Sequence, residues 1–182
     1  MPAYINTFNF FVSFGIIVLQ CLIVLLAVNL VFFRTKNNTI LIFFKKYGFL
    51  SGFMVAFFSM AISMFYSNII GFPPCELCWL QRIFLYPQVI LFGVDLYKRD
   101  RNIMDHSLAL ASVSSLISLF HIYVENGGAS TLSCATGGPN AISCATRYVF
   151  EFGYITVPVM SLTASLFIIL ILVNYKYMIK KS

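Results

Sequence analysis

Charged residues are scarce in this sequence, and their scarcity excludes most soluble folds. Only 10% of the 182 residues are charged, 60% are hydrophobic, and the mean hydropathy is +0.89. A typical soluble domain carries about 25% charged residues, so a water-soluble core is excluded. The chain also lacks repeats, low-complexity tracts and any separate soluble domain. The formal net charge of +6 does not indicate nucleic acid, because the basic residues lie in short clusters between apolar stretches.

Long apolar stretches predict five membrane-spanning helices. A helix needs about 20 apolar residues to cross a hydrocarbon layer that is about 30 Å thick. The predicted spans are residues 8–33, 47–70, 79–96, 103–124 and 152–175. We expect Pro158 to kink the fifth span near its beginning. The fold class is therefore predicted to be all-α, a polytopic membrane helical bundle.

The positions of the basic residues predict how the spans are oriented. Lys and Arg collect in cytoplasmic loops. The clusters on one predicted side are Arg34, Lys36, Lys45 and Lys46, then Lys98, Arg99 and Arg101, and finally Lys176, Lys180 and Lys181. This places the C-terminus in the cytoplasm, and the N-terminus, residues 69–78 and the loop 125–151 outside. Residues 1–7 carry no positive charge, so the first span is expected to be retained rather than cleaved as a signal peptide.

Cysteine is absent from every predicted cytoplasmic loop. Of the five cysteines, Cys21 lies within the first span, where an isolated apolar cysteine usually serves packing. Cys75 and Cys78 form a C-x-x-C motif near the start of the third span, and Cys134 and Cys144 lie in the glycine-rich outer loop. Since disulfides persist outside the cytoplasm, the pattern predicts two disulfides or one exchanging system. The loop pair could be a structural bridge or a reactive one that a soluble partner can reach.

The surroundings of the C-x-x-C motif favour a reactive thiol. Pro73 and Pro74 precede it, which places the motif in or near the first turn of a helix. A helix N-terminus stabilises a thiolate, and Cys78 is the expected beneficiary because it lies further into the helix. Arg82 follows one turn later on nearly the same face. It is either a snorkelling arginine or a positive charge suited to a carbonyl oxygen of a membrane-soluble electron acceptor.

The motif at residues 74–82, which reads Pro-Cys-Glu-Leu-Cys-Trp-Leu-Gln-Arg, resembles the bacterial disulfide bond formation protein B family. Its Gln-Arg ending is most similar to the branch often called BdbC. The resemblance implies an oxidase of the bacterial cytoplasmic membrane that uses ubiquinone or menaquinone and reoxidises a soluble, DsbA-like thiol oxidase of the thioredoxin type outside that membrane. Because the family core has four spans, residues 47–182 would form this core. Residues 1–46 would then be an added helix with its cytoplasmic loop.

The resemblance also implies a role for each cysteine outside the first span. The reduced partner would attack Cys134, and Cys144 would pass the electrons to Cys75. Cys78 would face the quinone, and Arg82 matches the quinone-side arginine of the family.

Two further features of the outer side are predicted to support this chemistry. His121 and Glu125 are one helical turn apart, at a spacing that would let them pair. Because quinone reduction consumes protons, His121 is predicted to line the quinone site or a proton path, and the alternative is a hydrogen-bonded interfacial histidine. The aromatic residues between positions 148 and 154 are expected to lie along the membrane surface and to hold Cys144 near Cys75.

Three rival classes share parts of this pattern. A membrane metal site or carrier would use the four outer cysteines as soft ligands, but the wide spacing of the loop pair disfavours it, and no metal site is expected. A structural or partner-docking protein would use the disulfides only as braces. The vitamin K epoxide reductase type also couples cysteines to a quinone, but there the C-x-x-C motif follows the loop pair, whereas here it precedes that pair.

Overall fold

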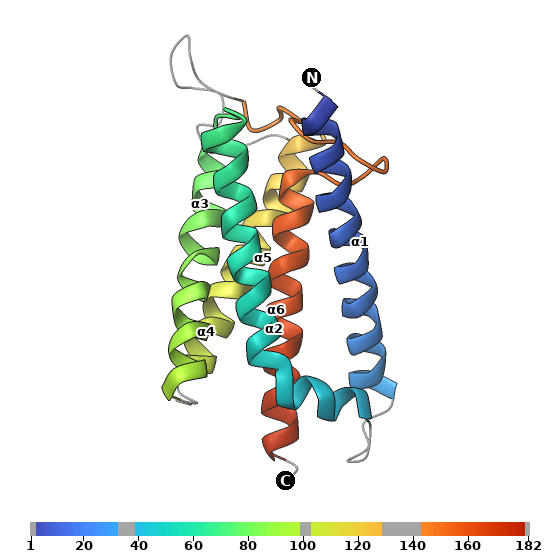
Figure 1. Cartoon of the computed structure of the whole chain (residues 1–182), viewed down its shortest axis with the longest axis vertical. Coiled ribbons are helices and arrows are strands. Elements are labelled where there is room, and N and C mark those ends of the chain that lie inside the picture. Colours follow the sequence, from blue (N-terminus) through green and yellow to red (C-terminus); the bar gives the residue numbers. More distant parts are fainter. Residues whose placement is uncertain (1–2, 33–38, 99–102, 129–142, 181–182) are drawn as a thin grey trace.

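The computed structural model describes residues 3–32, 39–98, 103–128 and 143–180. Its helices are α1 (Ala3–Phe32), α2 (Thr39–Met64) with the π-helical turn η1 (Phe65–Ile69), α3 (Glu76–Leu85), α4 (Pro87–Lys98), α5 (Ile103–Glu125) and α6 (Val157–Lys180). Five helical stretches are long and apolar enough to cross a membrane, and the described residues contain no strand beyond one isolated bridge. The prediction of an all-α polytopic bundle is confirmed, and Figure 1 shows the long helices side by side.

The third predicted span consists of two helices rather than one. α3 ends at Leu85 and α4 begins at Pro87, with Tyr86 between them. Proline has no N–H to donate and its ring clashes with the carbonyl four residues earlier, so the regular hydrogen bonding is interrupted here. Together the two helices still form one apolar stretch, Glu76–Lys98, that is long enough to cross a membrane.

Several helices begin or end at other residues than predicted, and two of these differences change the position of named residues. Lys45 and Lys46 lie inside α2 rather than before it, because this helix already begins at Thr39. The last helix, α6, begins at Val157 rather than at residue 152, because Phe152 and Gly153 have φ angles of 51° and 77° that no α-helix contains. Pro158 consequently lies in the first turn of α6, where a missing N–H breaks no hydrogen bond and no earlier turn exists to be kinked.

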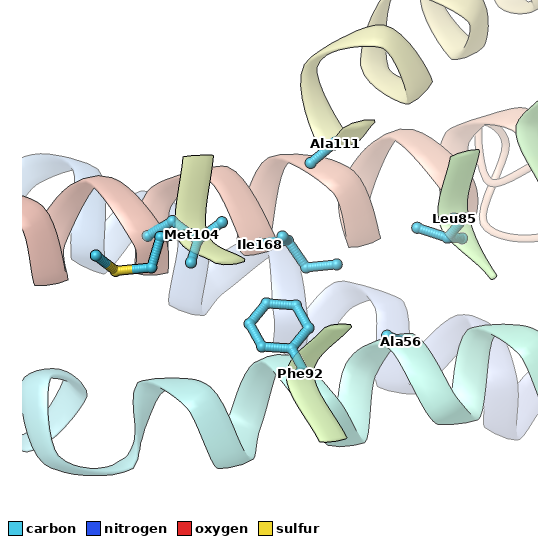
Figure 2. Packing of buried hydrophobic residues seen from close by; sticks show 7 residues of the cluster. Ala56, Leu85, Phe92, Met104, Ala111 and Ile168 are labelled. Atoms are coloured by element: carbon cyan, nitrogen blue, oxygen red, sulfur yellow. The ribbon is translucent and has the colours of Figure 1, made fainter. Parts of the chain in front are cut away.

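α6 is the central helix of the bundle and α1 is the peripheral one. In the apolar stretch of α6, 50% of the residues are buried, whereas in the apolar stretch of α1 only 11% are buried. α6 contacts α1, α2, α3 and α5. In the main core cluster, Phe92 of α4 lies between the helices that carry Ala56 and Ile168 (Figure 2). This close approach requires Gly52 on α2, because a Cβ there would lie 2.8 Å from the ring of Phe92.

Cys75, Cys78 and Cys144 belong to segments that lie at the same end of the bundle. The N-terminal end of α1, the beginning of α3 and residues 143–156 lie together there, and the C-terminal end of α6 lies at the opposite end (Figure 1). The fold therefore brings the C-x-x-C motif and the segment with Cys144 to the same end.

Candidate functional site

Cys75 and Cys78 lie at the beginning of α3. Cys75 is the N-cap residue, with an extended backbone, and its Sγ accepts the backbone N–H of Cys78 at 3.4 Å. Both thiols are free, and the two sulfur atoms are 3.2 Å apart. The structure thus holds the C-x-x-C motif as a dithiol at a helix N-terminus, where the unpaired N–H groups favour negative charge.

The thiolate-stabilising position belongs to Cys75 rather than to Cys78, which corrects the prediction. A hydrogen bond from the thiol of Cys78 is the largest cause that lowers the pKa of Cys75 below its ordinary value. His121 lowers this pKa further through a hydrogen bond and its positive charge, while burial of Cys75 opposes both effects. Both cysteines lie in or near the first turn, as predicted, but the prediction favoured the thiol further into the helix, whereas the N-cap side chain of Cys75 receives the free N–H of Cys78.

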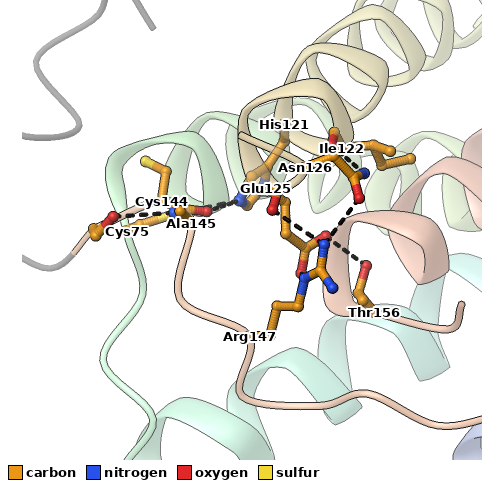
Figure 3. A network of polar contacts seen from close by, with 10 residues as sticks. Cys75, His121, Ile122, Glu125, Asn126, Cys144, Ala145, Arg147 and Thr156 are labelled. Carbon is orange, nitrogen blue, oxygen red and sulfur yellow. Dashed lines mark hydrogen bonds and ion pairs between the residues drawn. The ribbon is translucent and has the colours of Figure 1, made fainter. Parts of the chain in front are cut away.

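His121 contacts both cysteine segments (Figure 3). Its Nε2 is 3.7 Å from Cys75 Sγ and 3.2 Å from the backbone oxygen of Cys144. Its Nδ1 is 3.3 Å from the side-chain amide nitrogen of Gln81. A proton on Nε2 therefore faces the Cys75 sulfur and the Cys144 carbonyl, and it can be shared with either. His121 is only 3% exposed, so its ring is surrounded by protein atoms, including these three partners.

Gln81 is a site residue to which the sequence interpretation assigned no role. It is 4% exposed and lies one turn after Leu77 on the buried face of α3. A buried amide inside a membrane span must find a partner, because an unsatisfied polar group in hydrocarbon is costly. That rule could have marked Gln81 in the sequence, although it could not have identified the ring of His121 as its partner.

Cys144 packs in the same buried cluster as Cys75. The cluster contains Cys75, Leu77, Val124 and Cys144. Cys144 is disulfide-bonded and 2% exposed. Tyr148, four residues later, stacks on Phe72 with a centroid distance of 4.9 Å, and Phe72 lies three residues before Cys75. The aromatic segment therefore holds Cys144 near Cys75, as predicted, whereas Cys134 lies outside the described residues.

Glu125 does not pair with His121, although the helical spacing would allow it. Its carboxylate accepts a hydrogen bond of 2.8 Å from the hydroxyl of Thr156 and lies 3.7 Å from Nε of Arg147. Arg147 also donates to the backbone oxygen of Glu125 at 3.1 Å and to the side chain of Asn126 at 2.9 Å (Figure 3). Glu125 thus fastens the end of α5 to the segment that follows Cys144, while His121 faces the thiols.

Arg82 lies one turn after Cys78 and faces α2. Its Nε donates to Ser63 Oγ at 3.1 Å, and its Nη2 donates to the backbone oxygen of Ser63 at 3.2 Å. The guanidinium lies 5.2 Å from the centroid of the Trp79 ring. Within the described part of the chain, no carboxylate lies within 4.0 Å of Arg82. A guanidinium without a counter-ion inside a membrane span retains N–H donors for a ligand.

A cavity lies beside these groups and opens between several helices. Predicted site residues on its wall are Cys75, Cys78, Arg82 and His121. Most of the remaining wall is apolar, with side chains such as Ile62, Leu85 and Met160. Tyr86 also lines the cavity, and its buried hydroxyl has no hydrogen-bond partner among the described residues. An apolar cavity with a few convergent polar groups is the usual form of a small-molecule site.

Comparisons with known proteins cover the same part of the chain. A sequence model of the disulfide bond formation protein DsbB matches residues 45–174. The chain is 35% identical to disulfide bond formation protein C of Bacillus subtilis over 123 residues, which are 66% of this chain and 86% of that protein. It is 35% identical to a probable disulfide formation protein C of Bacillus cereus over 118 residues, with coverage of 65% and 84%.

A third relative is the SPbeta prophage-derived disulfide bond formation protein B of Bacillus subtilis. The identity is 38% over 118 residues, which are 65% of this chain and 78% of that protein. No solved structure gives a significant match. α1 lies outside the part of the chain that the sequence model matches.

Proposed function

This chain belongs to the disulfide bond formation protein DsbB family, and we propose that it passes electrons from a soluble thioredoxin-like thiol oxidase to a membrane quinone. Membership makes it a multi-pass bacterial membrane protein with a disulfide oxidoreductase role in disulfide bond formation. One arrangement supports the finer proposal: Cys78, the hydroxyl of Tyr86 and Arg82, which has no carboxylate partner among the described residues, share one cavity, and Cys144 packs next to Cys75.

In the proposed relay, electrons enter at the loop pair. A thiolate of the reduced partner attacks Cys134 in a disulfide with Cys144, and Cys144 leaves as a thiolate. The second partner thiol then displaces Cys134, which leaves the partner oxidised and the loop pair reduced. Two electrons have moved from the partner to the loop pair, and the partner has lost two thiol protons.

The second exchange moves the same two electrons to the C-x-x-C motif. The Cys144 thiolate attacks Cys75 in a Cys75–Cys78 disulfide, and Cys78 leaves as a thiolate. Cys134 then attacks Cys144, re-forms the loop disulfide and releases Cys75. The product has free Cys75 and Cys78 thiols and a re-formed disulfide between Cys134 and Cys144.

The environment of Cys75 favours this second exchange. A stabilised thiolate is a better leaving group. Because the Cys78 thiol and His121 lower the pKa of Cys75, its release from the mixed disulfide with Cys144 is favoured. His121 also holds the Cys144 segment through the backbone oxygen of Cys144. The imidazole therefore acts on both partners of the exchange, and we assign it a positioning and proton-holding role.

The cavity residues fit a lipid-soluble quinone. When bound, a quinone supplies an acceptor for two electrons and two protons. Arg82 retains N–H donors after its two bonds to Ser63, and the hydroxyl of Tyr86 is a second donor without a partner among the described residues. Both are suited to a carbonyl oxygen, and the apolar part of the wall is suited to the ring and tail of a quinone. Cys78 lines the same cavity and is the thiol that we assign to the acceptor side.

A thiol count on the purified full chain tests this function. The protein is fully reduced in lipid nanodiscs without oxygen, and a short-chain ubiquinone or a menaquinone analogue is added in excess. We expect the free thiols to fall from five to one, because the two pairs oxidise and Cys21 stays free. Tyr86→Phe, which removes only the hydroxyl, should raise the KM for the quinone roughly five- to tenfold.

Cys78→Ser is the decisive variant, and Cys21→Ser is its matched control. Cys78→Ser should abolish the quinone-dependent loss of thiols, whereas Cys21→Ser should oxidise at the rate of the unchanged protein. Quinone reduction that persists in Cys78→Ser contradicts the assigned role of Cys78. An unchanged chain that keeps all five thiols in the presence of quinone contradicts the proposed function.

A soft-metal site is the second candidate function, because one observation favours it. The two sulfur atoms of Cys75 and Cys78 and a ring nitrogen of His121 all lie within 4.8 Å of one another. Thiolate and imidazole are the ligands that zinc and copper(I) prefer. This ligand set differs from the four outer cysteines of the sequence-based alternative. This function would be supported by one metal ion per purified chain that protects the thiols from alkylation. A chelator should remove both the metal and the protection.

A further inference from the structure

α1 lies outside the part of the chain that the family model matches, yet it lines the acceptor cavity. Val12 and Ile16 of α1 are wall residues of the cavity that also contains Cys78 and Arg82. Both side chains are half-buried, whereas Val18, two residues after Ile16 and on nearly the opposite face of the helix, is 46% exposed. A helix that only anchors the bundle in lipid has no need to reach the acceptor cavity.

Polar contacts hold α1 on both sides of these two residues. One turn before Val12, the buried Asn9 accepts a hydrogen bond of 2.9 Å from the hydroxyl of Tyr66. One turn after Ile16, Gln20 donates to the hydroxyl of Thr163 at 3.3 Å and accepts a bond of 2.7 Å from the hydroxyl of Tyr154. The bond between Tyr66 and Asn9 is buried, and the three bonds together define the rotation of α1 about its axis.

Apolar packing holds the other half of α1. Leu26 is fully buried in a cluster with Phe44, Phe167 and Ile171. Leu30 packs with Leu41 and Met178 one turn further. Because α1 is fastened along its length to both α2 and α6, its Val12 and Ile16 side chains form a fixed wall. Both are β-branched and therefore have few rotamers in a helix.

The polar contact of α1 also reaches the segment that carries the thiols. Tyr66, which donates to Asn9, lines the cavity itself. Its ring stacks on Phe72 with a centroid distance of 5.9 Å and an interplanar angle of 9°. Phe72 in turn stacks on Tyr148, which follows Cys144. One aromatic stack thus connects α1 to both cysteine segments at the end of the cavity.

We infer that α1 completes the quinone site and selects the quinone by size, with Val12 and Ile16 limiting the ring system that can reach Cys78 and Arg82. The inference rests on the proposed function and adds a specificity-determining element to it. The ligand class is a lipid-soluble quinone, because the wall that α1 adds is apolar and the donors come from Arg82 and Tyr86.

Selectivity between quinones is the first test. Ile16→Trp narrows the cavity, and Val18→Trp places the same ring on the exposed face of α1. In the full chain in nanodiscs, Ile16→Trp should lower kcat/KM for a two-ring naphthoquinone by at least about tenfold more than for a one-ring benzoquinone. Val18→Trp should leave the ratio of the two kcat/KM values, naphthoquinone to benzoquinone, unchanged. Ile16→Ala, which removes atoms and avoids overpacking, should shift the ratio in the opposite direction.

Protection from labelling is the second test and does not depend on turnover. Ile16→Cys and Val18→Cys are each made in a Cys21→Ser background and fully oxidised, so that the introduced cysteine is the single free thiol. A lipid-soluble maleimide should label Ile16→Cys several-fold more slowly when a short-chain ubiquinone is present. Labelling of Val18→Cys should not change.

The outcomes separate this inference from the proposed function. If the unchanged chain reduces quinone but the Ile16 variants behave like the Val18 variants in both tests, α1 is only an anchor and the inference is overturned. If the unchanged chain does not reduce quinone, the proposed function fails instead. Altered selectivity together with specific protection of residue 16 supports the inference.

Discussion

At the scale of single residues, the reactivity of Cys75 depends on neighbours that are far apart in the sequence. The capping N–H comes from Cys78, three residues later, and the thiol of Cys78 also lowers the pKa of Cys75 through a hydrogen bond. The imidazole comes from His121, which is 46 residues away. Local spacing alone predicted the reactive motif and the position of Arg82. The partner of Cys75 could not be predicted in this way, because it depends on how α5 is rotated against α3.

The lowered pKa of Cys75 predicts an unusual pH dependence of its alkylation. The ordinary pKa of a thiol is 9.0, and below its pKa a thiol loses about tenfold in thiolate for each pH unit. Since the pKa of Cys75 is lower, its thiolate persists as the pH falls. We expect the alkylation rate to change by less than about twofold between about pH 8 and pH 6. Iodoacetamide and peptide mass mapping measure it in a reduced chain that retains only Cys75 and Cys78.

His121→Phe provides the comparison for this pH profile. The variant removes the hydrogen bond and the positive charge that lower the pKa of Cys75, while the ring keeps a similar volume in the buried site. Its alkylation rate should therefore start to fall at a higher pH than in the unchanged thiol pair. A profile that already falls tenfold per pH unit in both proteins would show that the site does not stabilise the thiolate.

At the scale of helices, hydropathy predicted the number of spans but not their internal breaks. Hydropathy reports how long an apolar stretch is, so residues 79–96 were read as one helix. The break at Tyr86 and Pro87 places the hydroxyl of Tyr86 at the cavity, and it follows from proline chemistry rather than from hydropathy. The late start of α6 has a similar origin, because the turn at Phe152 and Gly153 is apolar and resembles helix by composition alone.

Close packing of α2 against α4 predicts that Gly52 is sensitive to a single methyl group. A Cβ at Gly52 would lie 2.8 Å from the ring of Phe92, which is almost fully buried and cannot move aside. Gly52→Ala should therefore destabilise the protein by roughly 1–3 kcal/mol. Gly15→Ala is the matched control on α1, because nothing lies within 4 Å of its added Cβ. Thermal unfolding in one detergent should give a lower Tm for Gly52→Ala alone, and equal Tm values would contradict this packing.

At the scale of the whole molecule, the two ends of the bundle differ in chemistry. The described cysteines outside α1 lie at one end, and the C-terminal part of α6, with an ion pair of 2.6 Å between Lys176 and Asp105, lies at the other (Figure 1). All seven lysines of the sequence fall on the predicted cytoplasmic side. The helices alone do not define an orientation in the cell, so the charge bias remains the basis of that prediction.

Labelling from the two sides of the membrane tests this arrangement. In spheroplasts, a small charged methanethiosulfonate should label Cys75, Cys78, Cys134 and Cys144 after reduction, whereas a membrane-impermeant amine reagent should label no lysine. In inside-out vesicles the amine reagent should label lysines and the methanethiosulfonate should not label these four cysteines. The reason is that the predicted outer segments contain no lysine and the predicted cytoplasmic loops contain no cysteine. Peptide mass mapping identifies the labelled residues. If one cysteine pair reacted only from outside and the other only from inside, direct exchange between the pairs would be impossible, since a thiolate must contact the sulfur that it attacks.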